Sequence, residues 1–182
     1  MKIYWLAFWI IIFDQITKWM VKHWMNLHDS ISLIGTTVQL TYLENPGMAF
    51  GIRFFETHPF WSRWFFSIVS ILASIGLIWY IYRMRHERRM YRVSLALILG
   101  GAVGNLIDRV TFGRVVDFMD VDIPDLFGMQ RWPVFNVADS SVVLGMIVMS
   151  AFVMFTKHGK EQVQADEEET QTMIGTKKEM AE

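Results

Sequence analysis

Two acidic residues could carry chemistry in this chain. Asp117 and Asp139 each lie beside apolar sequence, and neither has a basic residue four positions away. A lone carboxyl group in such surroundings stays protonated, because burial disfavours its charged form. Two carboxyl groups that meet in one pocket instead share a proton, which makes one of them a base and the other an acid. With a water molecule between them, the pair could hydrolyse a peptide bond by the aspartic protease mechanism.

Other polar residues recur at helical spacing inside apolar segments. Asp14 and Lys18 are four residues apart, so they lie on one helix face and can pair. The same spacing defines two further sets, each on one side of a predicted helix: Gly101, Asn105, Asp108 and Arg109, and then Asn136, Asp139 and Ser140. All of them lie toward the outer ends of their helices, and Asp117 follows the first of these two sets closely. We therefore expect these side chains to converge in one pocket.

A purely structural role is the alternative for several of these residues. Asp14 with Lys18, and Asp108 with Arg109, could form salt bridges that only hold helices together. For the first pair both roles stay open. For Asp108 the structural role is favoured.

Rival hydrolytic chemistries have weaker support. The sequence has no HExxH motif, and four of its five histidines lie outside the predicted membrane spans, with His23 at the end of the first span, which disfavours a zinc site. Ser140 and Ser141 have no histidine or lysine nearby in the sequence to act as their base. The chain has no cysteine, so it offers neither a disulfide nor a cysteine nucleophile. We expect no metal and no cofactor.

The segments that must position these residues are apolar enough to cross a membrane. Hydrophobic residues make up 53% of the 182 residues and gather in blocks, and a helix of about 20 apolar residues spans the hydrocarbon core. The blocks predict transmembrane helices at about residues 3–25, 62–83, 91–109 and 136–157. The first block could be a cleaved signal peptide, but no small-x-small site follows it, so we expect a retained helix. Gly100 and Gly104 would let a neighbouring helix approach closely.

Basic residues set the expected orientation. The link between the second and third helices reads RMRHERRMYR, and lysines precede the first helix and follow the fourth. By the positive-inside rule, this link and both termini lie in the cytoplasm. The two longer connections then lie on the outer side. The polar tail, residues 159–182, is predicted to be disordered.

The first outer connection has strand patterning. Residues 38–42 alternate apolar and polar side chains, which predicts a strand. Residues 45–48 (NPGM) suit a type II turn, after which residues 49–53 could return as a second strand. We therefore expect a β platform at about residues 30–56. The predicted fold class is an all-α membrane protein, with four transmembrane helices in residues 1–158 and a small extracytoplasmic β-sheet.

Five sequence blocks carry a resemblance to a known family. They occur in the order DQITK (residues 14–18), NPGMAFG (45–51), GGAVGNLIDR (100–109), VVDF (115–118) and FNVADS (135–140). Each block alone is a weak signal, but five in this order are specific. Together with the predicted topology, they resemble the lipoprotein signal peptidase family, also called signal peptidase II, over nearly the whole of residues 10–142.

The resemblance implies an aspartic endopeptidase of the bacterial inner membrane, with its site near the outer face. Such an enzyme removes the signal peptide of diacylglyceryl-modified prolipoproteins and cuts just before the lipidated cysteine. The catalytic pair then falls on Asp117 and Asp139. Substrate-binding or supporting positions fall on Asn105, Arg109, Asn136, Asn45, Asp14, Lys18, Gly47 and Asp108. The implied partners are diacylglyceryl-prolipoproteins, membrane lipids and globomycin-type inhibitors, and no nucleic acid.

Two other function classes stay open. A small transporter or proton relay could use intramembrane acids to carry ions. A non-catalytic assembly factor could use the polar residues only for packing. A transporter should distribute its acids across the membrane or break its helices, whereas here the acids are predicted to cluster near one face. The sequence therefore favours the peptidase.

Overall fold

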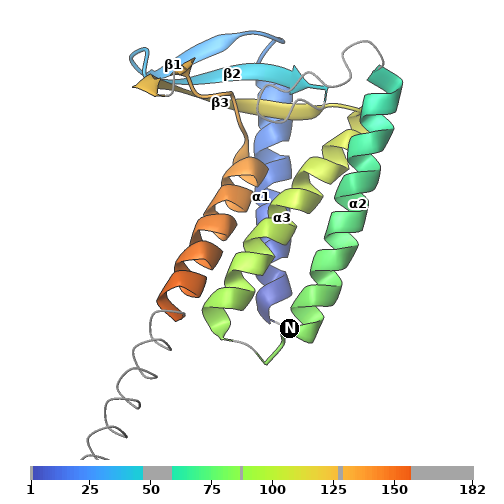
Figure 1. The fold of residues 1–182 in the computed structure, drawn as a ribbon. Coiled ribbons are helices and arrows are strands. Elements are labelled where there is room, and N and C mark those ends of the chain that lie inside the picture. Colours follow the sequence, from blue (N-terminus) through green and yellow to red (C-terminus); the bar gives the residue numbers. More distant parts are fainter. Residues whose placement is uncertain (1, 47–58, 87, 127–128, 157–182) are drawn as a thin grey trace, which may run out of the picture.

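Four helices stand side by side, and a β-sheet lies across one end of them (Figure 1). The computed structural model describes residues 2–46, 59–86, 88–126 and 129–156, so the predicted disordered tail lies outside the described residues. The helices are α1 (Lys2–Trp24), α2 (Pro59–Arg83), α3 (Arg89–Phe112) and a last helix, Val137–Thr156. The N-terminus and the connection from α2 to α3 lie at the end opposite the sheet (Figure 1).

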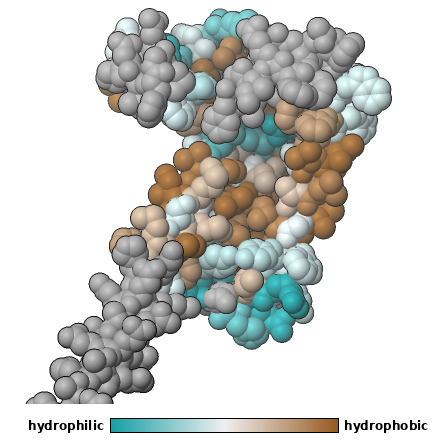
Figure 2. Space-filling view, viewed as in Figure 1, coloured by the Kyte–Doolittle hydropathy of each residue, from teal (hydrophilic) through white to brown (hydrophobic). Residues whose placement is uncertain are grey.

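The outer surface of the bundle is apolar. Figure 2 shows a hydrophobic band across the middle of the visible face, with hydrophilic residues at both ends. Within the described residues, three helices are long and apolar enough to cross a membrane: Trp64–Arg83, Arg89–Phe112 and Val137–Thr156. They correspond to the second, third and fourth predicted membrane helices, so this part of the predicted fold class is confirmed. The helix α1 has 23 residues but is not among the three.

The sheet is antiparallel and runs in the order β1-β2-β3-β4. Its strands are β1 (Ser30–Ile34), β2 (Val38–Asn45), β3 (Val115–Leu126) and the short β4 (Met129–Arg131). β2 confirms the strand predicted from the alternation at residues 38–42. The predicted return strand at residues 49–53, and Gly47 and Met48 of the predicted turn, lie outside the described residues. The described partners of β2 are β1 and β3. β1 lies within the predicted platform, although it was not itself named as a strand, whereas β3 lies outside the platform and was not predicted.

The connection from α3 to β3 brings polar residues of two strands together. α3 ends where Gly113 adopts a left-handed conformation (φ 77°) and donates its N–H to the Arg109 carbonyl. Glycine takes this conformation at the least cost. The chain then enters β3, where Val115 pairs with Asn45 of β2. Asp117 follows two residues later, so it lies close to the end of β2.

Glycines let α3 approach two other helices closely. A β-carbon on Gly104 would lie 2.7 Å from an Asp14 carboxylate oxygen, and one on Gly100 would lie 2.9 Å from a side chain of α1. The close approach predicted for this glycine pair is therefore confirmed. A β-carbon on Gly101 would collide with the backbone carbonyl of Ala138, in the last helix. Backbones this close bring polar side chains of three helices within reach of one another.

Two apolar clusters flank a polar layer. Away from the sheet, the first cluster consists of Ile3, Ala7, Ile81, Leu95, Ala96 and Leu99. The second joins the end of α1 to the sheet and consists of Val21, Met25, Tyr42, Val116 and Phe118. Between them along α1 lie Asp14 and Lys18, which expose only 0% and 2% of their surface. The candidate site therefore lies between two apolar cores, where water has little access.

Candidate active site

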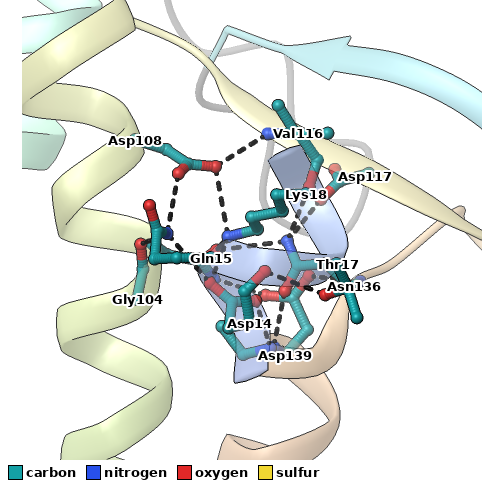
Figure 3. Close-up of polar contacts among 12 residues, drawn as sticks. Asp14, Gln15, Thr17, Lys18, Gly104, Asp108, Val116, Asp117, Asn136 and Asp139 are labelled. Atoms are coloured by element: carbon teal, nitrogen blue, oxygen red, sulfur yellow. Dashed lines mark hydrogen bonds and ion pairs between the residues drawn. The ribbon is translucent and has the colours of Figure 1, made fainter. Parts of the chain in front are cut away.

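A buried ammonium group lies at the centre of the polar layer (Figure 3). The Lys18 Nζ atom is 2.8 Å from an Asp14 carboxylate oxygen and 3.1 Å from an Asp108 carboxylate oxygen. It also donates a hydrogen bond of 2.9 Å to the Asn105 side-chain oxygen. An ammonium group has three protons to donate, and each has an acceptor here. The predicted Asp14–Lys18 pair is confirmed. The alternative pairing of Asp108 with Arg109 is wrong within the described residues, because Asp108 pairs with Lys18.

The two carboxylates extend this cluster to further elements. Asp14 accepts a hydrogen bond of 2.9 Å from the backbone N–H of Ala138, in the last helix. Asp108 accepts one of 3.0 Å from the backbone N–H of Val116, on β3. The Gln15 side-chain nitrogen joins the two acids, at 3.2 Å from Asp14 and 3.0 Å from Asp108. Each carboxylate therefore has three donors, and the cluster ties together α1, α3, β3 and the last helix.

Lys18 also determines which way the Asn105 amide points. An ammonium group can only donate, so the Asn105 side-chain oxygen faces Lys18. The amide nitrogen then points away from the lysine and donates a hydrogen bond of 2.7 Å to Asp139 Oδ1. A charge on α1 therefore decides that α3 offers Asp139 a hydrogen-bond donor.

Asn136 caps the last helix and holds Asp139 in its first turn. The Asn136 side-chain oxygen accepts from the Asp139 backbone N–H at 2.9 Å, and Asp139 Oδ2 accepts from the Asn136 backbone N–H at 3.2 Å. This reciprocal pattern is a capping box. Asn136 thus precedes the helix, which was predicted to begin at about residue 136. Asp139 therefore lies at the positive end of the helix dipole.

The second acid is held by the same asparagine. The Asn136 side-chain nitrogen donates a hydrogen bond of 2.6 Å to Asp117, and the Asn45 side-chain nitrogen donates one of 3.0 Å to the other Asp117 oxygen. Asp117 is only 4% exposed, whereas Asp139 is half-buried. Burial, and then the negative charge of Asp139, raise the pKa of Asp117 to about 7, although the two amide hydrogen bonds act in the opposite direction. Near neutral pH, the Asp117 carboxyl group is therefore divided between its protonated and charged forms.

The predicted site residues form one network within the described chain. The contacts above join Asp14, Lys18, Asn45, Asn105, Asp108, Asp117, Asn136 and Asp139. Arg109 lies at the edge: its guanidinium carbon is 5.8 Å from the centre of the Phe66 ring, and its charge acts on Asp139 and Asp117. Its Nε atom has no hydrogen-bond partner among the described residues. Gly47 lies outside them.

Three groups that hold the site were missed by the sequence reasoning. They are the Gln15 side chain and the backbone N–H groups of Val116 and Ala138. Every residue except proline has a backbone N–H, so the sequence does not indicate which of these groups will bind a carboxylate. Gln15 did have a signal, since it lies next to Asp14 in the DQITK block. Across the described ranges, no group of three or more histidine, cysteine, aspartate or glutamate side chains could hold a metal ion.

Comparisons with known proteins agree with this arrangement. Residues 6–155 match the family described as signal peptidase (SPase) II. A lipoprotein signal peptidase of Desulforapulum autotrophicum is 44% identical over 149 residues, which make up 81% of this chain and 88% of the relative. A lipoprotein signal peptidase of Bacillus velezensis is 38% identical over 162 residues, which make up 89% of this chain and 99% of the relative.

Two solved structures described as a bacterial membrane enzyme have the same fold. One has a TM-score of 0.73 and 32% identity, and the match covers 87% of this chain and 91% of that one. The other has a TM-score of 0.68 and 32% identity, with 84% and 92% covered. Because the family match and the similar sequences extend over most of the chain, the protein belongs to the signal peptidase II family and is a peptidase.

Proposed function

We propose that this protein is a membrane aspartic endopeptidase that removes signal peptides from diacylglyceryl-modified prolipoproteins, cutting just before the lipidated cysteine. Asp117 and Asp139 form its catalytic pair. The observation that carries the proposal is that one residue, Asn136, binds both acids. Its side-chain nitrogen donates to Asp117 and its backbone N–H donates to Asp139. Two acids held by one residue, one of them buried, can divide one proton between them, as aspartic protease chemistry requires.

The two acids lie in different surroundings, and this difference assigns their starting roles. Asp139 lies at a helix N-terminus, accepts two hydrogen bonds and is half-buried. Asp117 is buried on β3 near the negative charge of Asp139, which favours the carboxylic acid. Before substrate binds, Asp139 is therefore the base and Asp117 the acid.

Hydrolysis then follows from these two protonation states. Asp139 takes a proton from a water molecule while the water oxygen attacks the scissile carbonyl carbon. Asp117 gives its proton to the carbonyl oxygen, which becomes a hydroxyl group of the tetrahedral intermediate. As the intermediate collapses, Asp139 passes its proton to the leaving nitrogen and Asp117 recovers a proton from the hydroxyl group. The C–N bond is broken, and both acids return to their starting states.

Other residues of the network hold the acids or the substrate. Asn45 positions Asp117 from β2, and Asn105 positions Asp139 from α3. The Arg109 Nε atom, which is buried and lacks a partner among the described residues, can donate to a backbone carbonyl of the substrate. Leaving such a donor unpaired is costly, so substrate binding would remove that cost. The buried cluster of Asp14, Lys18 and Asp108 holds Asn105 in position and, within the described residues, forms no hydrogen bond or ion pair with the two catalytic acids. Gly47 stays a predicted substrate-binding position.

A lipid-modified substrate suits a bundle whose exposed large side chains are apolar. Each buried methylene contributes about 0.8 kcal/mol, so two acyl chains can anchor the scissile bond beside the site. Specificity can then rest on the lipid and on small residues before the cysteine, without a deep side-chain pocket. The same pair of acids would bind a hydroxyl group of a globomycin-type cyclic peptide, which accounts for inhibitors of that kind.

We further propose that α1 also spans the membrane, which makes four membrane helices. Its charged residues Asp14 and Lys18 are buried and paired, and a paired charge in the bundle interior is compatible with a membrane span. Its exposed large hydrophobic side chains are Tyr4, Trp5, Phe8, Trp9, Phe13, Ile16, Trp19 and Trp24. The arginines between α2 and α3 lie at the end away from the sheet, so the positive-inside rule places the site near the outer face of the bacterial inner membrane.

Reporter fusions test this orientation. Fusions at Glu87, between α2 and α3, and at Glu161 should both report a cytoplasmic position. A fusion at Gly35, between β1 and β2, should report an external one. The opposite pattern would mean that the sheet and the site face the cytoplasm.

Replacing either acid by asparagine should stop cleavage and leave the fold intact. Asparagine keeps the shape and accepts hydrogen bonds, but it cannot exchange a proton at neutral pH. A general acid–base group contributes about 10²–10⁴-fold, and the pair acts as a unit. Asp117→Asn and Asp139→Asn should therefore each lose nearly as much rate as the double variant. Single-turnover cleavage of a diacylglyceryl-modified prolipoprotein peptide measures this loss.

The controls separate chemistry from folding. Asp122→Asn makes the same change at a partly exposed position on β3 (40% side-chain exposure) and should keep wild-type cleavage. The same peptide without its lipid should be a poor substrate for the wild type. Appreciable cleavage by Asp139→Asn, or loss of its cooperative melting transition, would show that Asp139 is not a catalytic group.

The raised pKa of Asp117 predicts that stability depends on pH. An aspartate in the unfolded chain titrates near about 3.9, whereas folding raises the pKa of Asp117 to about 7. Between these values the folded state keeps a proton that the unfolded state has lost. Stability should therefore fall as pH rises from about 4 to about 7, by at most about 1.4 kcal/mol per pH unit, and then level off.

Melting curves of the wild type and Asp117→Asn at several pH values between 5 and 8 measure this dependence. The variant has no carboxyl group to titrate at this position. Its stability should therefore decrease much less between pH 5 and 7 than that of the wild type. An equal fall in both proteins would mean that Asp117 titrates at its ordinary pKa in the folded state.

A further inference from the structure

A pocket that does not include the two proposed catalytic acids adjoins the buried Lys18. It has a volume of about 500 Å³ and opens between the sheet-side ends of α1 and α3. Its lining residues are Gln15, Lys18, Trp19, Lys22, His23, Asp108, Phe112 and Val116. This set contains neither of the two acids, Asp117 and Asp139, nor Arg109. The volume is in the range of pockets that hold small molecules, and the proposed peptidase mechanism makes no use of it.

The accessible charge in this pocket is positive. The Lys22 Nζ atom lies 3.4 Å from the centre of the Phe112 ring, and Lys22 has no ion-pair partner among the residues that the structure describes. Deeper in the pocket, the charge of Lys18 is already compensated by Asp14 and Asp108. The pocket therefore presents one cation, Lys22, that has no ion-pair partner among the described residues.

A second donor and an apolar wall accompany that cation. The His23 ring stacks on Trp19 with their centres 5.2 Å apart, and a neutral imidazole still has one N–H to donate. Trp19 and Phe112 are 60% and 53% exposed, so they offer apolar surface beside the polar groups. An anion with an attached hydrocarbon chain matches both properties.

The position of the pocket indicates where such a ligand comes from. Its helical lining residues lie toward the C-terminal ends of α1 and α3. These helix ends lie beside the sheet (Figure 1). Exposed aromatic residues at this level, including Trp19 and Trp24, are typical of the headgroup region of a membrane. Cationic side chains at that depth attract lipid phosphates.

We propose that this pocket binds a glycerophospholipid of the surrounding bilayer, with its phosphate at Lys22 and His23. The glycerol and the first part of an acyl chain lie against Trp19 and Phe112. This site goes beyond the peptidase activity and is tested without any cleavage assay, so the two proposals can fail separately.

A photoreactive phosphatidylglycerol locates the site in the full-length protein in detergent. With a diazirine near its headgroup, it should crosslink to peptides that contain Trp19 or Phe112. Unlabelled phosphatidylglycerol should compete. Dioleoylglycerol, which has the chains without the phosphate, and soluble glycerol phosphate, which lacks the chains, should both compete poorly.

Substitutions then identify the phosphate-binding groups. Lys22→Gln should reduce crosslinking at these peptides roughly fivefold, the effect expected for one cation near a lipid phosphate, and Lys22→Arg should retain it. Arg85→Gln is a matched control, because the Arg85 guanidinium carbon also lies over an aromatic ring, 4.9 Å from the centre of the Tyr82 ring. Arg85 belongs to the connection from α2 to α3, which lies at the opposite end of the bundle. This substitution should not change crosslinking at this site.

Three results would overturn the proposal. They are wild-type crosslinking in Lys22→Gln, competition by dioleoylglycerol equal to that by phosphatidylglycerol, and full competition by glycerol phosphate. If Lys22→Gln melts at a lower temperature than the wild type in lipid-free detergent, Lys22→Arg decides the question. Loss of crosslinking in that charge-preserving variant, with its melting unchanged, would also count against the site.

Discussion

The site depends on one buried positive charge. The Lys18 ammonium donates to Asp14, Asp108 and Asn105, and the two acids in turn hold backbone N–H groups of β3 and the last helix. A buried charge is stable only when such partners surround it. The positions of α1, α3, β3 and the last helix are therefore coupled, because movement of any one of them would leave a buried polar group unpaired.

The same lysine orders the site beyond its own contacts. Because it can only donate, it turns the Asn105 oxygen toward itself and the Asn105 nitrogen toward Asp139. Asn136 then joins Asp139 to Asp117. The two acids end in unequal surroundings, one in the first turn of a helix and the other buried in a sheet. Catalysis by a pair of acids needs this inequality, since one must start as the base and the other as the acid.

Features that depend on local spacing could be predicted from the sequence. Contacts between residues that are far apart in the sequence could not. The Asp14–Lys18 pair follows from a spacing of four residues, and the membrane helices follow from uncharged blocks. The strand β3 was missed because its partner β2 lies far away in the sequence. Asp108 was placed beside its neighbour Arg109 for the same reason, although its partner is Lys18 on another helix. A sequence shows how side chains are spaced along one helix or strand. The contacts between two elements depend on how closely their backbones approach each other.

The most direct test of this account is the melting and cleavage of Lys18→Met. Methionine has a similar length but no charge. The substitution therefore leaves two buried carboxylates without their cation and lets the Asn105 amide rotate. Breaking a buried ion pair costs about 3–5 kcal/mol, and cleavage should fall even at temperatures where the variant is folded. Arg114→Met breaks an exposed pair with Glu44 (53% and 27% side-chain exposure) and should cost at most about 1 kcal/mol. If Lys18→Met instead melts and cleaves like the wild type, the buried charge does not organise the site.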